Sequence, residues 1–365
     1  MKIAVLTSGG VDSSVALKLL QKEGHDVTAF YLKIWLEDEL SFLGNCPWEQ
    51  DLKYLRQICK TSKIPLKIIP LQKEYFDTVV KYTLEEVKAG RTPNPDIMCN
   101  NNIKFGLFLS EIDHIFKKIA TGHYAQTARL QAGPFINKSF CRQAKHHLYF
   151  LKKSPDKVKD QTYFLSNLKQ NQLKRLMFPV GHLTKAEVRK LAKKYNLPNK
   201  DRKDSQGICF LGKFKYDEFI KHYLGTKTGD ILEYESGKKL SEHEGFWYYT
   251  IGQRKGIKLS GGPWFVVKKD LKKNIIYVSN QYHAPDKKRD TLKVSKFNWF
   301  SGRFPLKQNL QVKLRHGENF YNCKIKRINK NQALLKISGN DQGIAPGQFA
   351  AFYDGEICLG SAVII

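Results

Sequence analysis

A short apolar strand that leads directly into a glycine turn and a helix constrains this fold more than any other feature. Ile3–Leu6 is apolar, Thr7–Gly10 is a turn, and apolar residues from Val11 to Glu23 repeat with helical spacing. Strands and helices then alternate, with strands expected at Val27–Leu32, Leu66–Pro70 and Lys118–Thr121 and helices at Leu52–Thr61 and Glu74–Lys88. This alternation predicts a parallel sheet with helices on both faces, whose ligands bind beyond the carboxyl ends of the strands.

The turn, Ser8–Ser14, has the composition of an anion-binding loop. Its glycines allow a tight backbone, and successive N–H groups at a helix N-terminus attract phosphate. The hydroxyls of Ser13 and Ser14 can cap the helix or donate to phosphate oxygens. The loop lacks the Gly-Lys-Ser/Thr ending whose lysine reaches the terminal phosphates in Walker loops. This composition favours ATP chemistry at the α-phosphate, which releases pyrophosphate and leaves an AMP ester.

The second half of the chain has the pattern of short strands separated by turns. Strands are expected at Thr228–Tyr234, Trp247–Ile251, Trp264–Lys268, Ile275–Val278, Val312–Arg315, Tyr321–Ile328, Ala333–Ile337, Phe349–Tyr353 and Ala362–Ile365. We therefore predict an α/β catalytic domain over residues 1–224, a small β-rich domain over 225–292, and a β-rich C-terminal domain over 293–365, expected to be a β-barrel.

The balance of charge points to a polyanionic partner. There are 62 Lys and Arg residues against 34 Asp and Glu residues, a formal net charge of +28. Such an excess suits nucleic acid, since Lys and Arg bound to phosphates release condensed counterions. A compositional bias or simple solubility is the alternative explanation.

Cysteine usage and hydropathy indicate a soluble protein that is either cytoplasmic or already trimmed of a transit segment. Seven cysteines occur without a CxxC pair or regular spacing, at positions 46, 59, 99, 141, 209, 323 and 358. This pattern argues against a zinc site or a disulfide scaffold and fits a reducing compartment. We see no secretory signal and no apolar run of membrane-spanning length, so neither a membrane segment nor a metal-ligand cluster is expected.

Two cysteine-containing segments could carry sulfur chemistry. In Gly90–Asn100, two prolines predict an extended rigid loop, in which Asn94 could meet a base edge, Asp96 carry a proton and Cys99 act as nucleophile. In Lys203–Gly212, Cys209 lies between two glycines and could accept and deliver sulfur. For each cysteine taken singly, a packed and inert thiol is the alternative.

The loop Ser8–Ser14 resembles the PP-loop of ATP pyrophosphatases, and the ordered series of motifs resembles the tRNA-specific 2-thiouridylase family over nearly the whole chain. The stretches that carry the resemblance are 8–14, 90–100, 103–105, 121–124, 159–165, 178–181, 203–212, 248–254, 269–271 and 345–348. The resemblance implies a PP-loop domain that binds ATP and transfers sulfur to the wobble uridine of tRNA, at position 34.

The resemblance also implies roles for particular residues. ATP would be bound by Leu6, Thr7, Ser8, Gly9, Gly10, Val11, Asp12, Ser13, Leu32 and Gly122. The target base would meet Asn94, Pro95 and Asp96, and tRNA would contact His123, Lys159, Asp160, Gln161, Arg315, His316 and Gln348. Cys209 would carry a persulfide supplied by a sulfur-donor protein, and Cys99 would be the second thiol. Mg²⁺ is expected beside the pyrophosphate, and a monomer is sufficient for a partner of tRNA size.

Two other functions remain open from the residues themselves. Another adenylating PP-loop enzyme, such as a tRNA lysidine synthetase or an amidating synthetase, would need no cysteine pair. A non-catalytic RNA-binding protein with a relic nucleotide loop would release no pyrophosphate with tRNA. The retention of Asp12, Ser13, Asp96, Cys99 and Cys209 argues against this second possibility.

Overall fold

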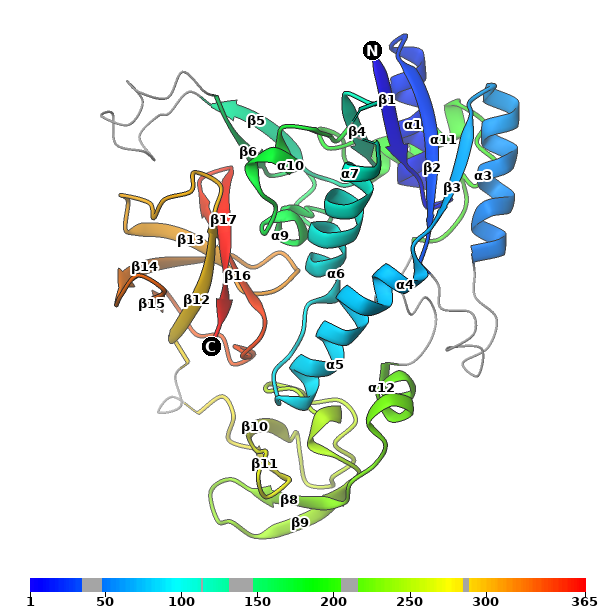
Figure 1. Ribbon diagram of the computed structural model, residues 1–365. Helices are drawn as coiled ribbons and strands as arrows, with labels where there is room; N and C mark the ends of the chain where they lie inside the picture. Colours follow the sequence, from blue (N-terminus) through cyan, green and yellow to red (C-terminus); the bar gives the residue numbers. More distant parts are fainter. Residues whose placement is uncertain (35–47, 113, 131–146, 205–215, 285–288) are drawn as a thin grey trace.

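The computed structural model describes residues 1–34, 48–112, 114–130, 147–204, 216–284 and 289–365 (Figure 1). Its first half alternates strands and helices: β1 Lys2–Leu6, α1 Val11–Lys22, β2 Asp26–Lys33, α3 Trp48–Ser62, β3 Leu66–Pro70, α4 Gln72–Tyr75, the π-helix η2 Phe76–Val80, α5 Lys81–Lys88, α6 Pro95–Met98, the π-helix η3 Cys99–Leu107, α7 Phe108–Ile112, β4 Lys118–Thr121, β5 Gln126–Leu130, β6 Leu148–Lys152, α9 Thr162–Leu165, α10 Gln170–Leu173, β7 Leu176–Met177, α11 Lys185–Lys194 and α12 Tyr216–Leu224.

A five-stranded parallel sheet forms the centre of this half, in the order β3-β2-β1-β4-β7. Alternate residues of β1 point to opposite faces, as the pleat requires. Ile3 and Val5 pack with α1 and α3, whereas Ala4 and Leu6 pack with Phe105 of η3 and other residues of a second core. Both faces are covered, which explains why β1 is apolar at successive positions.

The second half contains only strands and one short 3₁₀ helix among its described residues: β8 Gly229–Glu233, β9 Lys239–His243, η4 Phe246–Tyr248, β10 Phe265–Asp270, β11 Ile275–Ser279, β12 Thr291–Trp299, β13 Asn309–Lys313, β14 Tyr321–Arg327, β15 Gln332–Ile337, β16 Phe349–Asp354 and β17 Ile357–Ile364. Strands β8–β11 form a four-stranded sheet in the order β10-β11-β8-β9.

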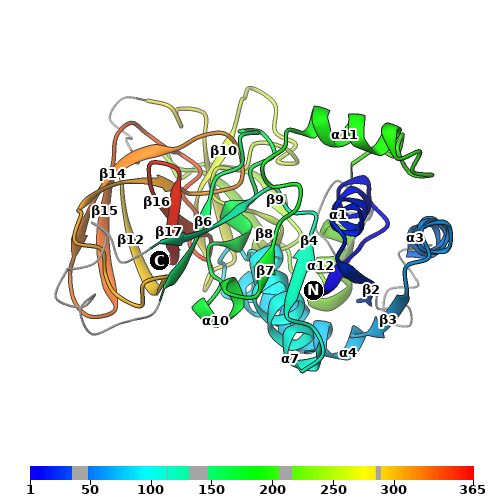
Figure 2. The ribbon, with the colours of Figure 1, turned by 90° about the horizontal axis from the view of Figure 1, so that it is seen from above.

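Strands β12–β17 close into a barrel, because β12 pairs with β15 on one side and with β17 on the other. The barrel and the layer of α1, α3 and α11 lie at opposite ends of the molecule in both views (Figures 1 and 2). The predicted fold class, a parallel-sheet domain followed by β-rich units of which the last is a barrel, is confirmed.

A hairpin from the first half extends the barrel sheet. Strand β6 pairs with β17 through Ile357 and Cys358, and β5 pairs with β6. The apolar cores of the barrel and of one face of the parallel sheet are therefore continuous. The predicted domain boundaries at 224/225 and 292/293 stay predictions. The β5–β6 hairpin belongs to the first predicted domain in sequence, but it pairs with a strand of the third.

Two local predictions are wrong. Trp247–Ile251 is not a strand, because Phe246–Tyr248 forms a 3₁₀ turn and the Thr250 N–H binds the Gln253 side chain at 2.9 Å. The segment Gly90–Asn100 is not extended throughout, since α6 begins at Pro95 and η3 follows it. Proline has no N–H to lose at the first helical position, so it starts a helix there instead of preventing one.

Candidate active site

The loop between β1 and α1 lies at the carboxyl edge of the parallel sheet, where ligands of such sheets bind. Thr7 is held to β2 by its N–H and its hydroxyl, which both donate to the Phe30 carbonyl. The Ser13 hydroxyl accepts from the Ser8 N–H at 3.2 Å and donates to the Gly10 carbonyl at 3.1 Å. The loop is thus curled around the first turn of α1, whose N–H groups have no partner within the helix.

Two glycines let other backbone segments approach this loop. Gly9 has φ +68°, and a side chain there would meet the Asp51 carbonyl oxygen at 2.5 Å. At the end of β4, a Cβ on Gly122 would lie 2.6 Å from the Ser13 nitrogen. Main chain therefore packs directly against main chain at both glycines. The N–H groups at the start of α1 form the kind of anion cradle that fits the phosphates of ATP.

The carbonyl of Gly9 is fixed from a distant part of the chain. Asn199 donates to it at 2.8 Å and to the Ser14 hydroxyl at 2.9 Å. Arg202 donates to the same carbonyl and to the Asp51 carboxylate. The loop is therefore held from outside by the turn that follows α11.

A cluster of ion pairs stands over the same loop. The Lys185 ammonium lies 2.7 and 2.9 Å from the two carboxylate oxygens of Asp12, and the Tyr124 hydroxyl donates to Asp12 at 2.8 Å. Lys185 also lies 2.7 Å from the carboxylate of Asp204. A lysine thus meets the loop from α11, although the loop sequence lacks a lysine of its own.

The predicted base-binding residues lie at the junction with the barrel. Asn94 caps α6 by accepting from the Ile97 N–H at 3.1 Å, and its amide donates to Gln348 at 3.2 Å. Gln348 in turn donates to the Pro93 carbonyl at 2.8 Å. Asn94 is buried, whereas Asp96 is partly exposed. The structure therefore brings Gln348, a predicted tRNA contact, against the predicted base site, although 254 positions separate it from Asn94.

Cys99 is a buried cysteine, 1% exposed, at the first position of η3. It packs in a cluster with Val79, Val80, Ile103 and Phe219, the last of which belongs to α12. π-helical segments recur at functional sites, because they interrupt the regular α-helical ladder. Cys209 lies outside the described residues.

The other predicted tRNA contacts range from exposed residues on the barrel to partly or fully buried ones. Arg315 and His316 are exposed on the barrel, and the His316 ring lies 4.7 Å from the Phe164 ring. Arg315 pairs with Asp341 and lines a hollow of about 380 Å³ between the barrel and the β8–β11 sheet. Lys159 is partly exposed and binds Asp204.

Asp160, Gln161 and His123 have internal partners. Asp160 is almost fully buried, 3.5 Å from the equally buried Lys313, and Gln161 accepts from the Tyr124 N–H at 2.9 Å. His123 binds Thr121 and packs against the rings of Phe105 and Phe178. Desolvation, together with the nearby Lys104 charge, lowers the pKa of His123 to about 3.

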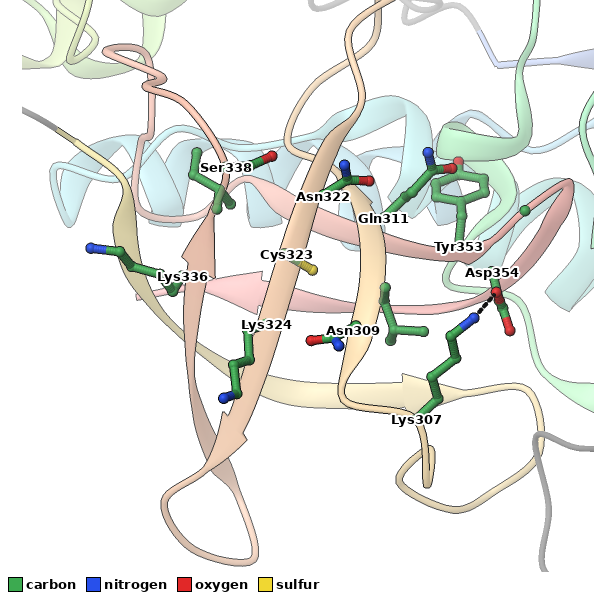
Figure 3. A pocket seen from close by; sticks show the side chains of 13 residues that line it. Lys307, Asn309, Gln311, Asn322, Cys323, Lys324, Lys336, Ser338, Tyr353 and Asp354 are labelled. Carbon is green, nitrogen blue, oxygen red and sulfur yellow. Dashed lines mark hydrogen bonds and ion pairs between the residues drawn. The ribbon is translucent and has the colours of Figure 1, made fainter.

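A second hollow, of about 530 Å³, lies on the outside of strands β13–β15 (Figure 3). Lys324, Lys336 and the amides of Asn309, Gln311 and Asn322 face it. It includes none of the predicted site residues and lies across the molecule from β1 (Figures 1 and 2).

We call the predicted ATP loop, the residues that contact it and Asp204, the ion-pair partner of Lys185, the ATP edge. Sequence reasoning missed four residues of this edge: Lys185, Asp204, Asn199 and Arg202. The missing Walker lysine was a signal that a cation should come from elsewhere, but nothing local indicated which one. Among the described residues, no three His, Cys, Asp or Glu side chains gather as a metal site. No helix in the described part of the chain is long and apolar enough to cross a membrane.

Three family models match successive parts of the chain. Residues 1–213 match the tRNA methyl transferase HUP domain, 217–280 the tRNA methyl transferase PRC-barrel domain, and 289–364 the aminomethyltransferase beta-barrel domain. A solved U34-tRNA thiolase, NcsA from Methanococcus maripaludis, is similar over 54% of this chain and 58% of its own, at 19% identity and a TM-score of only 0.33.

Curated relatives match from end to end. The tRNA-specific 2-thiouridylase MnmA of Parabacteroides distasonis is 45% identical over 100% of this chain and 99% of its own. The protein of the same name from Porphyromonas gingivalis is 44% identical over the same shares. The chain therefore belongs to the tRNA-specific 2-thiouridylase family.

Proposed function

We propose that this protein is an ATP-dependent tRNA sulfurtransferase, which converts the wobble uridine at position 34 of tRNA to 2-thiouridine and releases AMP and pyrophosphate. The observation that carries the proposal is the full-length match, at 45% identity, to a protein named as a tRNA-specific 2-thiouridylase. The ATP edge supports it, because a main-chain cradle without a Walker lysine suits attack at the α-phosphate.

Activation by ATP is needed because the C2 carbonyl of uracil is a poor electrophile and its oxygen a poor leaving group. Attack of that oxygen on the α-phosphate expels pyrophosphate and turns the oxygen into part of an AMP leaving group. The loop Leu6–Ser13 would hold the phosphates, with Leu32 and Gly122 near the adenosine. Asp12 is a suitable oxygen ligand for Mg²⁺, which would neutralise phosphate charge when bound.

The target base would lie beside Asn94, Pro95 and Asp96. In an anticodon loop the base can leave its stack at modest cost, so a protein can reach its C2 position. We call Asn94, Pro95 and Asp96 the base segment. The hydrogen bond between Asn94 and Gln348 attaches this segment to the barrel, which would hold the tRNA. Asp96 would be the carboxylate that manages the proton of the uracil ring.

Sulfur would arrive as a persulfide on Cys209. Its terminal sulfur attacks C2 of the adenylated base and displaces AMP, which forms a base–sulfur–sulfur–Cys209 adduct. The Cys99 thiolate then attacks the Cys209 sulfur, leaving sulfur on the base and forming a Cys99–Cys209 disulfide that a thiol reductant must reopen. Cys99 could instead act earlier and free hydrosulfide from Cys209.

Cys99 must become accessible to play this part. Its burial in an apolar cluster that also includes Phe219 of α12 opposes access. Along the chain, α12 begins at Tyr216, seven residues after Cys209. We propose that Cys99 becomes exposed during sulfur delivery.

The remaining partners follow from the same chemistry. A persulfide on Cys209 requires a sulfur-donor protein, such as a cysteine desulfurase or a relay protein. Contacts of tRNA with His123, Lys159, Asp160, Gln161, Arg315, His316 and Gln348 are proposed on family resemblance. We propose a cytoplasmic monomer, since one chain presents a complete set of the proposed residues.

The decisive experiment is thiolation of wobble-uridine tRNA with ATP and a persulfide source, read by nucleoside mass spectrometry and pyrophosphate release. Cys99→Ser and Cys209→Ser should release pyrophosphate without forming 2-thiouridine. Cys59→Ser is the matched control, because Cys59 is also a buried cysteine but lies in α3, and this variant should thiolate normally.

If both serine variants thiolate normally, the two-cysteine mechanism is wrong and only an adenylating enzyme remains. If the wild-type protein releases no pyrophosphate with tRNA, the protein is not an adenylating enzyme for that substrate.

A further inference from the structure

The carboxylate of Asp204 binds both Lys185, which contacts the ATP loop, and Lys159, which is expected to contact tRNA. Asp204 lies 2.7 Å from the Lys185 ammonium and 2.6 Å from the Lys159 ammonium, on different carboxylate oxygens. Arg189 donates to Asp204 at 2.8 Å. Three cations from two separate parts of the chain therefore converge on one side chain.

The same two lysines share a second anchor at their backbones. The Asp156 carboxylate accepts from the Lys159 N–H at 3.0 Å and from the Lys185 N–H at 2.9 Å, one on each oxygen. Each lysine is thus held at both ends, by Asp156 at the main chain and by Asp204 at the ammonium. A long flexible side chain fixed in this way loses little further freedom when it meets a substrate.

The charges of this cluster favour an arrangement in which a lysine lies between two carboxylates. Lys185 separates the carboxylates of Asp12 and Asp204, which would repel each other without it. Burial alone would raise the pKa of Asp204, but the hydrogen bonds from Lys159 and Lys185 outweigh burial and hold that pKa at about 2. Asp204 is therefore ionised wherever the enzyme could work, and only 26% of its side chain is exposed.

We propose that Asp204 is a positioning residue for the thiolation reaction, which aligns Lys185 at the ATP loop with Lys159 on the tRNA side through one shared carboxylate. The inference rests on the proposed function, since it takes ATP and tRNA as the two substrates. Asp204 touches neither of them and acts through the two lysines. Loss of its charge should disturb the alignment of the substrates while leaving the cations that attract tRNA in place.

This role predicts that loss of the Asp204 charge lowers the rate of 2-thiouridine formation without weakening tRNA binding. Asp204→Asn removes one negative charge beside three cations, so tRNA should bind as tightly as to the wild type or up to about threefold more tightly. The single-turnover rate of 2-thiouridine formation at saturating ATP and tRNA should fall by about 10- to 100-fold, because small misplacements of reacting groups cost rates of that order. Asp204→Glu, which keeps the carboxylate, should recover most of the rate.

Asp201→Asn is the matched control. Asp201 is exposed three residues earlier in the same turn, and its substitution makes the same change of charge. It should affect tRNA affinity about as Asp204→Asn does, measured by filter binding at fixed salt, and it should keep the wild-type rate. All variants are compared as full-length proteins, with thermal denaturation recorded for each.

Two results would overturn the proposal. One is an Asp204→Asn variant with the rate of Asp201→Asn. The other is an Asp204→Asn variant that loses tRNA affinity and thermal stability together and is not rescued by Asp204→Glu, because that pattern marks a purely structural residue. Failure of the proposed function would be seen separately, as wild-type protein that forms no 2-thiouridine.

Discussion

The ATP edge and the base segment are both assembled from distant parts of the chain, but by different forces. At the ATP edge the long-range links are mostly ionic and partly open to solvent, as in the bonds of Lys185 to Asp12 and Asp204. At the base segment they are neutral amide bonds between Asn94 and Gln348, around a buried Tyr163. Ionic links can exchange partners when a polyphosphate arrives, whereas neutral buried ones cannot do so cheaply. The difference indicates a responsive ATP edge and a rigid base segment.

The largest effect is expected from a substitution that disrupts the ATP edge and leaves the base segment intact. Gly122→Val would place side-chain atoms on the backbone of Ser13, where even a Cβ would lie 2.6 Å away. We expect ATP-dependent pyrophosphate release to fall by at least about 100-fold, since the loop must shift. Binding of tRNA, measured by filter binding, should change little.

Gly225→Ala serves as its control, because Gly225, whose φ is +65°, has nothing within 4 Å of an added Cβ. Its cost should be limited to local backbone strain of about 1 kcal/mol. Normal pyrophosphate release by Gly122→Val would mean that the loop does not hold ATP.

The hydrogen bond between the side-chain amides of Asn94 and Gln348, which we call the amide clamp, should stabilise the fold. Removing it should destabilise the protein without affecting ATP binding. Asn94→Ala removes the cap of α6 and the bond to Gln348, and we expect a loss of about 2 kcal/mol in the free energy of unfolding. A double-mutant cycle with Gln348→Ala should give a coupling of about 1 kcal/mol, measured by urea denaturation. The coupling should be the same at low and high salt, and a coupling that fades with salt would contradict a neutral clamp. Asn309→Ala, an exposed amide on β13, is the control.

His123 links the two regions, because it follows Gly122 and packs on Phe105 of η3. Its pKa in the folded protein is about 3, below the ordinary 6.5, so the unfolded chain binds the proton more tightly. Stability should therefore be constant above about pH 6.5 and fall by up to about 1.4 kcal/mol per pH unit below it, until the pH approaches the folded value.

Urea denaturation at a series of pH values between about 7.5 and about 5 would test this dependence. His123→Gln should flatten the profile, and His182→Gln, at an exposed histidine, should not. An unchanged slope in His123→Gln would show that another group titrates.

The smallest effect is expected from salt on the ionic edge. A double-mutant cycle of Lys185→Met with Asp204→Asn should give about 1 kcal/mol at low salt, because both side chains are only partly exposed. That coupling should fall to less than about half at roughly 500 mM salt, where the screening length is shorter than 5 Å. A salt-independent coupling would remove the contrast with the amide clamp.

Sequence reasoning succeeded where the determinants are local. The strand, loop and helix from Lys2 to Lys22 are encoded by apolar spacing and two glycines, and the structure has them within a residue of the prediction. It failed at Pro95, where a local rule was applied without its exception for the first helical turn.

It could not find Lys185 or Asp204 as neighbours of the ATP loop. Lys185 lies 173 positions from Asp12, in a helix whose other exposed lysines look the same in sequence. Only the packing of α11 against α1 distinguishes it. The buried pair of Asp160 and Lys313 was equally hidden, because charged residues are normally expected at the surface.

Strand β17 pairs with β16, β12 and β6, so one strand both closes the barrel and carries the hairpin from the first half. On the ribosome, the β5–β6 hairpin is made more than 200 residues before Ile357–Ile364. Until that strand emerges, the hairpin has an open edge exposed to other chains. Loss of β17 would therefore damage the barrel and the first half of the protein at once.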